Sequence, residues 1–293
     1  MRIGVVGLGV MGAPVAATLA GAHEVLAYDI DRGRAEAAAA SGIPVARSMK
    51  EVVRASEVMI TVLPGPGETA TVMDAVEHRF TAGSIWLDLS TGDPRVTRRV
   101  VERMHEAGVA CVTATMAGGP AAARARELLF TVAGAVETVQ RITPPLELLA
   151  APGGVDVIGT DPAEAQTVKL LSNLLWFGQV VAVTEAMLLG RATGIEPARL
   201  QELLAARAGS SVMLERDYGA VLRGDYMGAF GIDRVVEQIA TMRAMAADFA
   251  VPFELSSVVA RVHEEALAAY GPVAGELLAA KLLEERSGRP LAR

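Results

Sequence analysis

Lys169 and Asn173 stand four residues apart in a segment whose pattern predicts a helix. Residues at this spacing share one face of a helix, so the two side chains are expected to point the same way. Lys169 has the apolar neighbours Val168, Leu170 and Leu171, and removal of water from an ammonium lowers its pKa. Such a lysine can act as general acid or base at a carbinol oxygen, whereas a solvated surface lysine is the commoner case.

A glycine-rich turn with the spacing G-x-G-x-x-G follows the first apolar run of the chain. It consists of Gly7, Leu8, Gly9, Val10, Met11 and Gly12. The first glycine permits a tight turn, the second lets the backbone approach a pyrophosphate, and the third lets the next helix pack against the strand. The N-terminus of that helix offers N–H groups and a partial positive charge to phosphates. The turn therefore predicts a dinucleotide-binding site.

Asp29 ends the second expected strand, twenty residues after Gly9. An acidic residue at this point accepts hydrogen bonds from the adenosine ribose and repels a 2′-phosphate. Ile30 follows it rather than an arginine, although Arg32 lies close by. The sequence therefore favours NAD over NADP. The alternative for Asp29 is a helix cap for the segment beginning near Asp31.

Three further loops at strand ends are candidates for the nicotinamide and the substrate. They contain Leu63 and Pro64, then Ser90 and Thr91, then Ala117, Gly118 and Gly119. Consecutive glycines expose N–H groups that can hold a carboxylate. Taken alone, the first and third of these loops are more often plain turns, and a Ser or Thr placed as in the second is as often a helix cap as a ligand contact.

The first half of the chain alternates short apolar strands with helical segments. The expected strands are Arg2–Val6, Glu24–Tyr28, Val58–Leu63, Ser84–Leu89, Val109–Thr113, Leu128–Ala133 and Val155–Ile158. This alternation predicts a mostly parallel sheet of the Rossmann type, whose ligands bind beyond the carboxyl ends of the strands. From Asp161-Pro162 a helix is expected to run to about Arg191, and helical periodicity continues after it.

We therefore expect an α/β domain over residues 1–160 and an all-α domain over residues 161–293, joined by a long helix at about 162–191. A chain that changes class in this way commonly places its active site between the two parts. No metal site is expected.

Composition narrows the class of protein. The chain has 293 residues and a net charge of −7, which argues against nucleic acid as a partner. The one cysteine, Cys111, lies in an apolar run and is expected to be a buried small residue. Met1 and Arg2 lead directly into the first strand, and no apolar run reaches the length of a membrane span. A cytoplasmic protein is expected.

Taken together, these motifs resemble the β-hydroxyacid dehydrogenase family, which includes 3-hydroxyisobutyrate dehydrogenase and is related to 6-phosphogluconate dehydrogenase. The family's G-x-G-x-M-G is met by the first turn, including Met11. Its D-x-S-T-x-x-P is met by Asp88, Ser90, Thr91 and Pro94, and its K-x-x-x-N by Lys169 and Asn173. The motifs stand in the family's order, and the resemblance covers nearly the whole chain.

The resemblance implies a role for each matched residue. The glycine turn and Asp29 bind NAD, and the nicotinamide is contacted by Leu63, Pro64 and Thr91. The substrate carboxylate is held at Gly118 and Gly119, next to Ala117 and Ser90. Lys169 moves the proton at the reacting oxygen, while Asn173 positions Lys169 and the substrate. The family also implies a homodimer or homotetramer built through the helical domain.

The sequence departs from the family at several points. The segment Thr113–Ala117 replaces D-A-P-V-S, so the serine before the two glycines is lost. A later glycine of the same loop becomes Arg126, and G-x-G before the lysine helix becomes Ala163-Glu164-Ala165. A Lys-Asp pair near the cofactor becomes Glu237-Gln238. These changes indicate a substrate that differs from the common ones of the family.

The leading hypothesis is an NAD-dependent oxidoreductase of a small 3-hydroxy acid and its semialdehyde or keto form, with Lys169 as general acid/base. One alternative is a nicotinamide-binding sensor or scaffold that has lost catalysis, suggested by the altered loop and by Glu237. The other is an imine reductase, which shares the architecture. Lys169 and Asp29 argue against that enzyme, since imine reductases usually carry another residue at the lysine position and prefer NADP.

Overall fold

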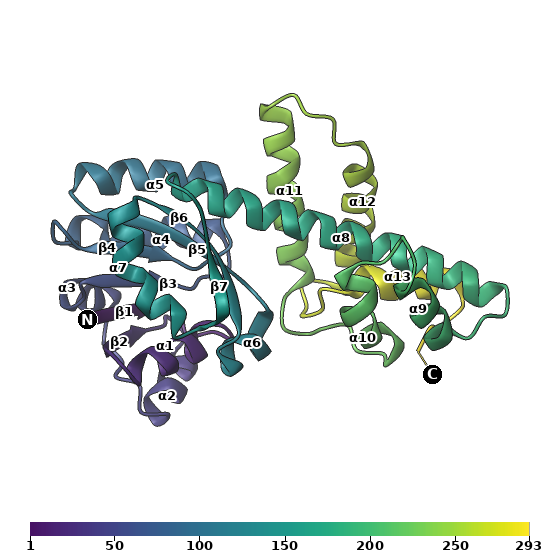
Figure 1. The fold of residues 1–293 in the computed structure, drawn as a ribbon, viewed down its shortest axis with the longest axis horizontal. Helices are drawn as coiled ribbons and strands as arrows, with labels where there is room; N and C mark the ends of the chain where they lie inside the picture. Colours follow the sequence, from purple (N-terminus) through teal and green to yellow (C-terminus); the bar gives the residue numbers. More distant parts are fainter. Residues whose placement is uncertain (293) are drawn as a thin grey trace. The chain divides into compact units, whose positions relative to one another are not determined.

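The computed structural model describes residues 1–292 and divides into two compact units, Met1–Lys169 and Leu170–Arg293. Figure 1 draws the first unit in purple to teal and the second in green to yellow. Each unit is described by itself below.

The first unit is built on a seven-stranded sheet with the order β2-β1-β3-β4-β5-β6-β7. The strands are β1 (Arg2–Val6), β2 (Glu24–Tyr28), β3 (Val58–Thr61), β4 (Ile85–Asp88), β5 (Ala110–Ala117), β6 (Leu128–Gly134) and β7 (Ala150–Gly159). Neighbouring strands pair in parallel, except for the antiparallel pair β5 and β6. The predicted mostly parallel α/β sheet is confirmed.

Helices lie on both sides of this sheet (Figure 1). They are α1 (Gly12–Ala20), α2 (Arg32–Ala40), α3 (Met49–Ala55), α4 (Pro66–Val76), the 3₁₀ turn η1 (Glu77–Arg79), α5 (Pro94–Glu106), α6 (Gly119–Ala125) and α7 (Val136–Glu147). Side chains of Asp31, Ser48 and Asp93 accept backbone N–H groups in the first turns of α2, α3 and α5. These caps satisfy N–H groups that a helix start leaves without a partner, and they fix where each helix begins.

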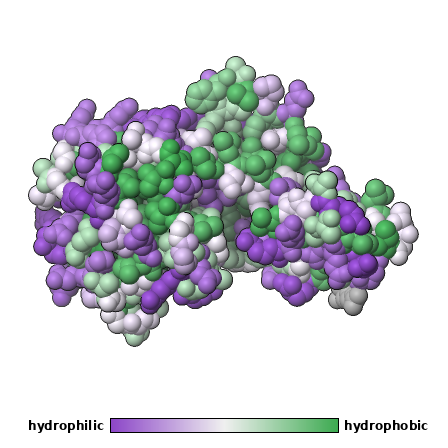
Figure 2. Space-filling model, in the orientation of Figure 1, coloured by the Kyte–Doolittle hydropathy of each residue, from purple (hydrophilic) through white to green (hydrophobic). Residues whose placement is uncertain are grey.

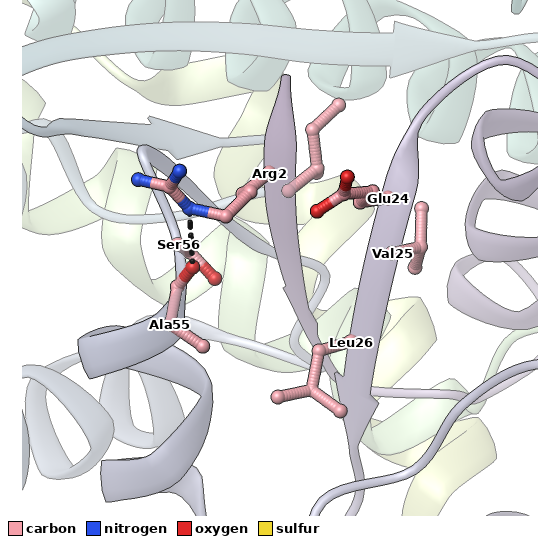
Figure 3. Close-up of a pocket in the computed structure, with 7 residues that line it drawn as sticks. Arg2, Glu24, Val25, Leu26, Ala55 and Ser56 are labelled. Atoms are coloured by element: carbon pink, nitrogen blue, oxygen red, sulfur yellow. Dashed lines mark hydrogen bonds between the residues drawn. The ribbon is translucent and has the colours of Figure 1, made fainter.

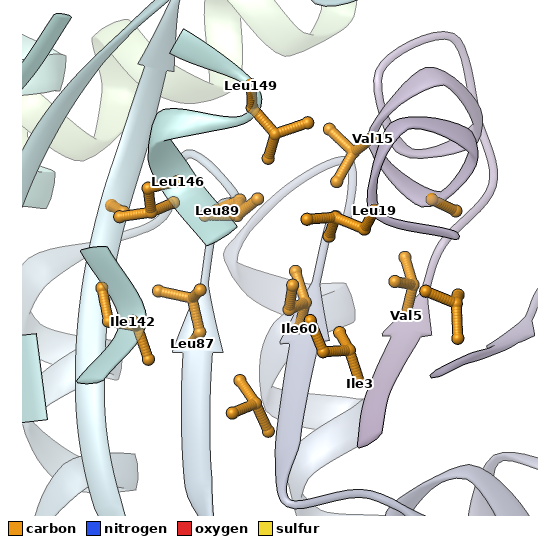
Figure 4. Packing of buried hydrophobic residues seen from close by; sticks show 14 of the residues in the cluster. Ile3, Val5, Val15, Leu19, Ile60, Leu87, Leu89, Ile142, Leu146 and Leu149 are labelled. Atoms are coloured by element: carbon orange, nitrogen blue, oxygen red, sulfur yellow. The ribbon is translucent and has the colours of Figure 1, made fainter. Parts of the chain in front are cut away.

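Alternate residues of strands β1 to β5 enter two different hydrophobic layers. Ile60 of β3 packs in the layer beneath α1 and α7, whereas its neighbour Met59 packs in the layer beneath α3, α4 and α5. Figure 4 shows the first layer, with Leu19 of α1 and Ile142 of α7 facing the sheet. Side chains of a strand point to opposite faces in turn, so a strand covered on both sides must be apolar throughout. Cys111 is 3% exposed, which confirms the predicted buried cysteine.

The second unit is helical, as predicted. Helix α8 (Pro162–Ala192) begins in the first unit and continues into the second. It is followed by α9 (Pro197–Ala205), the π-helical turn η2 (Met213–Asp217), α10 (Gly219–Leu222), α11 (Ile232–Asp248), α12 (Glu254–Tyr270) and α13 (Leu278–Ser287). Along α8, the buried residues Leu170, Phe177, Val180 and Met187 recur at helical spacing and join one core with α11 and α12.

Helix α8 is the one helix, among residues 1–292, that is long and apolar enough to cross a membrane by length and composition. Its 31 residues include a window of mean hydropathy 1.3, of which 28% is buried within the chain. The core helix of a soluble protein meets the same criteria, and buried side chains of α8 belong to the hydrophobic cluster of the second unit.

Candidate active site

The glycine turn after β1 contains two glycines that the fold requires and one that it does not. Gly7 has a φ of +98°, and a Cβ at this residue or at Gly12 would collide with backbone atoms of the fold. A Cβ at Gly9 would meet Arg34 Nη1 at 3.9 Å as its one neighbour within 4 Å among the described residues. The fold therefore requires Gly7 and Gly12 itself, whereas Gly9 leaves open space. A ligand that must approach the backbone accounts for a glycine at such a place.

The rest of the turn fits a phosphate group. Val10 is 58% exposed and Met11 is the N-cap of α1, while Leu8 is buried in the core of the first unit. The first turn of α1 carries no acidic residue, and no side chain from residues 1–292 caps it. Its partial positive charge would therefore be available to a pyrophosphate without competition from a carboxylate in that turn. The residues present fit a dinucleotide.

Asp29 holds the glycine turn in place. Its Oδ2 accepts the Leu8 N–H at 2.7 Å and its Oδ1 accepts the Asp31 N–H at 2.8 Å, and the residue is 8% exposed. The cap of α2 is Asp31, which accepts the Arg34 N–H, so the alternative of Asp29 as the helix cap was wrong. A carboxylate can accept about four hydrogen bonds, so Asp29 retains capacity for ribose hydroxyls.

Arg34 is a neighbour of this turn that sequence reasoning missed. Its Nη1 lies 3.9 Å from Asp29 Oδ2, and 55% of the Arg34 side chain is exposed. Arg32, the arginine singled out from the sequence, is 91% exposed and pairs with Glu36 instead. The signal that could have identified Arg34 is its position in the first turn of α2, three residues after the cap Asp31.

The loop after β4 is built around a buried carboxylate. Asp88 is 1% exposed, and its Oδ1 accepts the Thr61 hydroxyl at 2.8 Å and the Ser90 N–H at 3.0 Å. The Thr61 hydroxyl in turn accepts the Trp86 indole N–H at 3.0 Å. Burial raises the pKa of Asp88, and these hydrogen bonds work against that rise.

The same loop contains two predicted site residues. Ser90 is 2% exposed, and its hydroxyl accepts the Leu63 N–H at 3.0 Å, so it connects the loops after β3 and β4. Thr91 is half-buried and Pro64 is exposed. The sheet thus brings Leu63, Ser90 and Thr91 together at the carboxyl ends of adjacent strands. Their contacts with cofactor or substrate stay predictions.

Gln166 of α8 was also missed. It is fully buried, and its amide contacts Gly92, Asp88 and Ser90 in the loop after β4. A glutamine has no titratable group, so a search for catalytic chemistry in the sequence passes over it.

The loop after β5 has a backbone conformation that favours glycine. Gly118 and Gly119 have φ angles of +114° and +68°, and a Cβ at Gly118 would come within 2.6 Å of the Ala122 Cβ. Ala117 and Gly118 are exposed at the end of the strand. Arg126, which ends α6, has a φ of +61°, a conformation that an L side chain adopts at a cost. Arg126 thus replaces the family's glycine at a residue whose backbone is left-handed.

Lys169 and Asn173 lie one helical turn apart on α8, and the boundary of the two units falls just after Lys169. Lys169 is half-buried in the first unit. In the second unit, Asn173 Nδ2 donates to Gln238 Oε1 of α11 at 2.7 Å, and Gln238 is 6% exposed. Gln238 is therefore a third residue whose placement sequence reasoning missed, although it was known as a departure from the family.

The other departure on α11, Glu237, accepts a hydrogen bond from Arg234 Nη1 at 2.9 Å. Within residues 1–292 no group of three or more His, Cys, Asp or Glu side chains could hold a metal ion.

A cavity of about 200 Å³ lies beside Arg2, Glu24 and Ser56 (Figure 3). It is at the amino ends of β1 and β2, away from the glycine turn, so it is not the dinucleotide site.

Two family models match this chain. The NAD binding domain of 6-phosphogluconate dehydrogenase matches residues 2–160, and the NAD-binding domain of NADP-dependent 3-hydroxyisobutyrate dehydrogenase matches residues 163–283. The chain belongs to the β-hydroxyacid dehydrogenase family. As a member of this family it is an oxidoreductase that uses a nicotinamide cofactor and acts on CH–OH groups.

Individual members of the β-hydroxyacid dehydrogenase family are similar over most of their length. The 2-(hydroxymethyl)glutarate dehydrogenase of Eubacterium barkeri is 27% identical over 270 residues, which are 90% of this chain and 88% of that protein. A solved structure of the Mycobacterium tuberculosis 3-hydroxyisobutyrate dehydrogenase with L-serine has a TM-score of 0.86 and 26% identity, covering 96% of this chain and 98% of that one.

An imine reductase from Pseudomonas sp. is less similar. Its solved structure has a TM-score of 0.64 and 20% identity, covering 96% of this chain and 99% of that chain. A likeness at this level shows the fold alone. The hydroxyacid dehydrogenases therefore account for the chain better than the imine reductases do.

Proposed function

We propose that the chain is an NAD-dependent dehydrogenase that interconverts a small 3-hydroxy acid and its semialdehyde or keto form, with Lys169 as the general acid/base. One observation carries the assignment of the reaction to these residues. Lys169 and Asn173 lie one turn apart on α8, in a chain whose first unit carries a glycine turn open at Gly9. In this proposal the glycine turn binds the cofactor, Lys169 carries the proton, and the Asn173 amide positions Lys169 and the substrate.

The reaction needs a hydride carrier and a proton carrier. A bound nicotinamide supplies the hydride acceptor or donor. Lys169 takes the proton from the carbinol oxygen during oxidation and returns it during reduction. Asn173 gives one N–H to Gln238, which leaves its second N–H and its carbonyl oxygen available to the substrate hydroxyl or to Lys169.

NAD is proposed as the cofactor because of Asp29. Its carboxylate is fixed against the Leu8 N–H and can accept the ribose hydroxyls as well. A 2′-phosphate would meet this negative charge and be repelled. Arg34 opposes the repulsion, since its guanidinium lies 3.9 Å from Asp29 Oδ2.

The proposed substrate is a 3-hydroxy acid, held by its carboxylate at Gly118 and Gly119 with Ala117 and Ser90 nearby. Two compounds named with relatives support this class: 2-(hydroxymethyl)glutarate and L-serine. Both carry an alcohol on the carbon next to the one that bears a carboxylate. Gly119 supports the site because a Cβ there would enter open space, where a ligand could approach the backbone.

Assembly through the second unit is part of the proposal. Phe249, Val251 and Leu255 are 70%, 57% and 77% exposed, and Figure 2 shows hydrophobic surface over the end of α11 and the start of α12. Large exposed apolar patches of this kind favour protein–protein contact. A homodimer or homotetramer is expected in sedimentation; a monomer at all concentrations would contradict it.

The test of the proposed reaction is Lys169→Ala. Loss of a general acid/base is expected to lower kcat by about 10³-fold, while the Kd of NADH, measured by fluorescence, stays within about twofold. The matched control is Lys50→Ala, an exposed lysine of α3, which should leave both values unchanged. The substrate for these measurements is identified first, by testing a panel of small hydroxy acids for turnover with NAD and with NADP.

The alternative function is a nicotinamide-binding sensor without catalysis. Its supporting observations are the strained Arg126 and the Arg234–Glu237 pair, where the family has a glycine and a lysine. Turnover of any hydroxy acid at an ordinary enzymic rate rules it out. The sensor would be established instead if the protein binds NADH but turns over no hydroxy acid, and if Lys169→Ala binds NADH as the wild type does.

A further inference from the structure

One buried side chain connects α8 to the loop after β4. Gln166 has no exposed surface, and its amide makes three hydrogen bonds with that loop. The Oε1 accepts the Gly92 N–H at 2.7 Å. The Nε2 donates to Asp88 Oδ2 at 3.1 Å and to the Ser90 carbonyl at 3.2 Å. Both ends of a neutral amide are thus used within one short loop.

The Asp88 carboxylate beneath the loop accepts hydrogen bonds at both of its oxygens. Thr61 and the Ser90 N–H donate to Asp88 Oδ1, and Gln166 donates to Oδ2. The Thr61 hydroxyl donates its one hydrogen to Asp88 while its oxygen accepts the Trp86 N–H. An acceptor role at both oxygens matches an ionised carboxylate, which needs these donors once it is away from water.

The loop and the amide fit closely. A Cβ at Gly92 would lie 3.3 Å from Gln166 Nε2, so a larger residue there would press on the amide. The same turn of α8 is held from β5, because the Thr115 hydroxyl donates to the Ala165 carbonyl at 3.3 Å. Ala163 and Ala165 are fully buried, so the family's two glycines are replaced here by residues whose methyl groups pack inside.

We propose that Gln166 is a positioning residue of the reaction: it fastens the Ser90–Gly92 loop to α8 and thereby sets the position of Thr91 relative to Lys169. Both neighbours of Thr91 are bonded to Gln166, and Lys169 follows Gln166 by three residues on the same helix. This inference rests on the proposed function, in which Thr91 contacts the nicotinamide and Lys169 moves the proton. A small displacement between such groups lowers the rate far more than it lowers binding.

The first test compares Gln166→Leu with Thr167→Val. Leucine keeps the approximate size of the side chain and removes the amide, whereas Thr167 is the next residue of α8 and bonds its own helix at the Ala163 carbonyl. Gln166→Leu is expected to lower kcat by about 10²-fold with the Kd of NADH within about threefold. Hydrogen exchange at the Gly92 amide should be at least about tenfold faster. Thr167→Val should change none of the three.

The second test uses Gln166→Glu and a pH profile. While it is protonated, the carboxyl group that this substitution introduces can still accept the Gly92 N–H and donate its own proton to Asp88 Oδ2. As pH rises the pair of carboxyl groups loses this proton, and two buried carboxylates then repel each other. The kcat of Gln166→Glu relative to the wild type is therefore expected to be largest at low pH and to fall as pH rises. A role in folding alone predicts no such dependence for the folded enzyme.

The outcomes separate this proposal from the proposed function. If the wild type turns over no hydroxy acid, the proposed function fails, and faster exchange at Gly92 in Gln166→Leu then still supports the fastening of the loop. Wild-type kcat in Gln166→Leu overturns the positioning role, whatever the exchange rate. If Gln166→Leu does not fold, Gln166→Glu decides, and a pH profile parallel to the wild type overturns the proposal.

Discussion

Two glycine-rich turns lead from a strand end into a helix in the first unit, and they differ in how much of the turn the fold itself explains. In the turn after β1, Gly7 and Gly12 are required by backbone contacts, and Gly9 faces open space. In the turn after β5, Gly118 is required by Ala122, and Gly119 faces open space. Each turn thus has one glycine that packing does not require.

The two turns diverge beyond that shared feature. The turn after β1 matches the family's pattern throughout and is held by Asp29. The turn after β5 has lost the family's serine at Ala117, and its helix ends on the left-handed Arg126. Of these two turns, the one proposed to bind the cofactor keeps the family's glycine spacing, and the one proposed to bind the substrate departs from the family's pattern at Ala117 and Arg126.

The largest expected effect is at Gly9. Gly9→Val places its side chain in the space that the pyrophosphate needs, so the Kd of NADH is expected to rise by about 100-fold or more with little change in Tm. Calorimetric binding and a thermal melt measure the two quantities. Gly12→Val is the contrasting variant and is expected to unfold the first unit, because its side chain collides with the Gly7 carbonyl. A stable Gly12→Val protein would break the distinction between the two glycines.

The next effect in size is at Gly119. Gly119→Ala must keep a φ of +68°, which costs about 1 kcal/mol for an L residue, or shift the N–H that is proposed to bind the carboxylate. We expect KM for the hydroxy acid to rise by roughly tenfold, with the Kd of NADH unchanged. Equal losses of substrate and cofactor binding would show that the second turn is not a separate substrate site.

A smaller effect is expected at Arg34. Arg34→Leu removes the guanidinium that partly neutralises Asp29, so the affinity for NADPH relative to NADH should fall by about fivefold. Fluorescence titration with both reduced cofactors gives the ratio, and Arg32→Leu is the control. A shift with Arg32→Leu alone would assign the 2′-phosphate contact to the other arginine.

The smallest effect is on stability at Arg126. Arg126→Gly relieves the left-handed backbone but increases the freedom of the unfolded chain, so the free energy of unfolding is expected to rise by no more than about 1 kcal/mol. Urea denaturation measures it. Arg124→Gly, inside α6, should instead lower stability by about 1 kcal/mol. If Arg126→Gly is the less stable of the two, Arg126 contributes a contact that outweighs its backbone strain.

Much of the fold could be predicted because local signals were strong. The strands Arg2–Val6 and Glu24–Tyr28 have the predicted bounds, and α8 begins at the predicted Pro162. Strand β7 was expected to begin at Val155 but begins at Ala150, because Pro152 and two glycines hide its first half. The antiparallel pairing of β6 with β5 was not predicted, since pairing direction depends on residues far apart in the chain.

Candidate site residues could be named from the sequence where their chemistry lies in ionisable groups or glycine spacing, as at Lys169 and Gly9, and their roles stay predictions. The amides Gln166 and Gln238 were not predicted as site residues, because their hydrogen-bond partners lie 78 and 65 residues away in the chain. The placement of Arg34 beside Asp29 likewise depends on the turn into α2, which side-chain type alone does not reveal.

The hydrogen bond from Trp86 to Thr61 has a practical consequence. The chain has two tryptophans, Trp86 in the first unit and Trp176 in the second. The indole of Trp86 donates into the same network that holds Asp88 and Gln166, whereas the indole of Trp176 donates to Asp217 at 2.9 Å. Each unit therefore contains its own fluorophore, and replacing either tryptophan with phenylalanine leaves a protein whose emission reports on one unit alone.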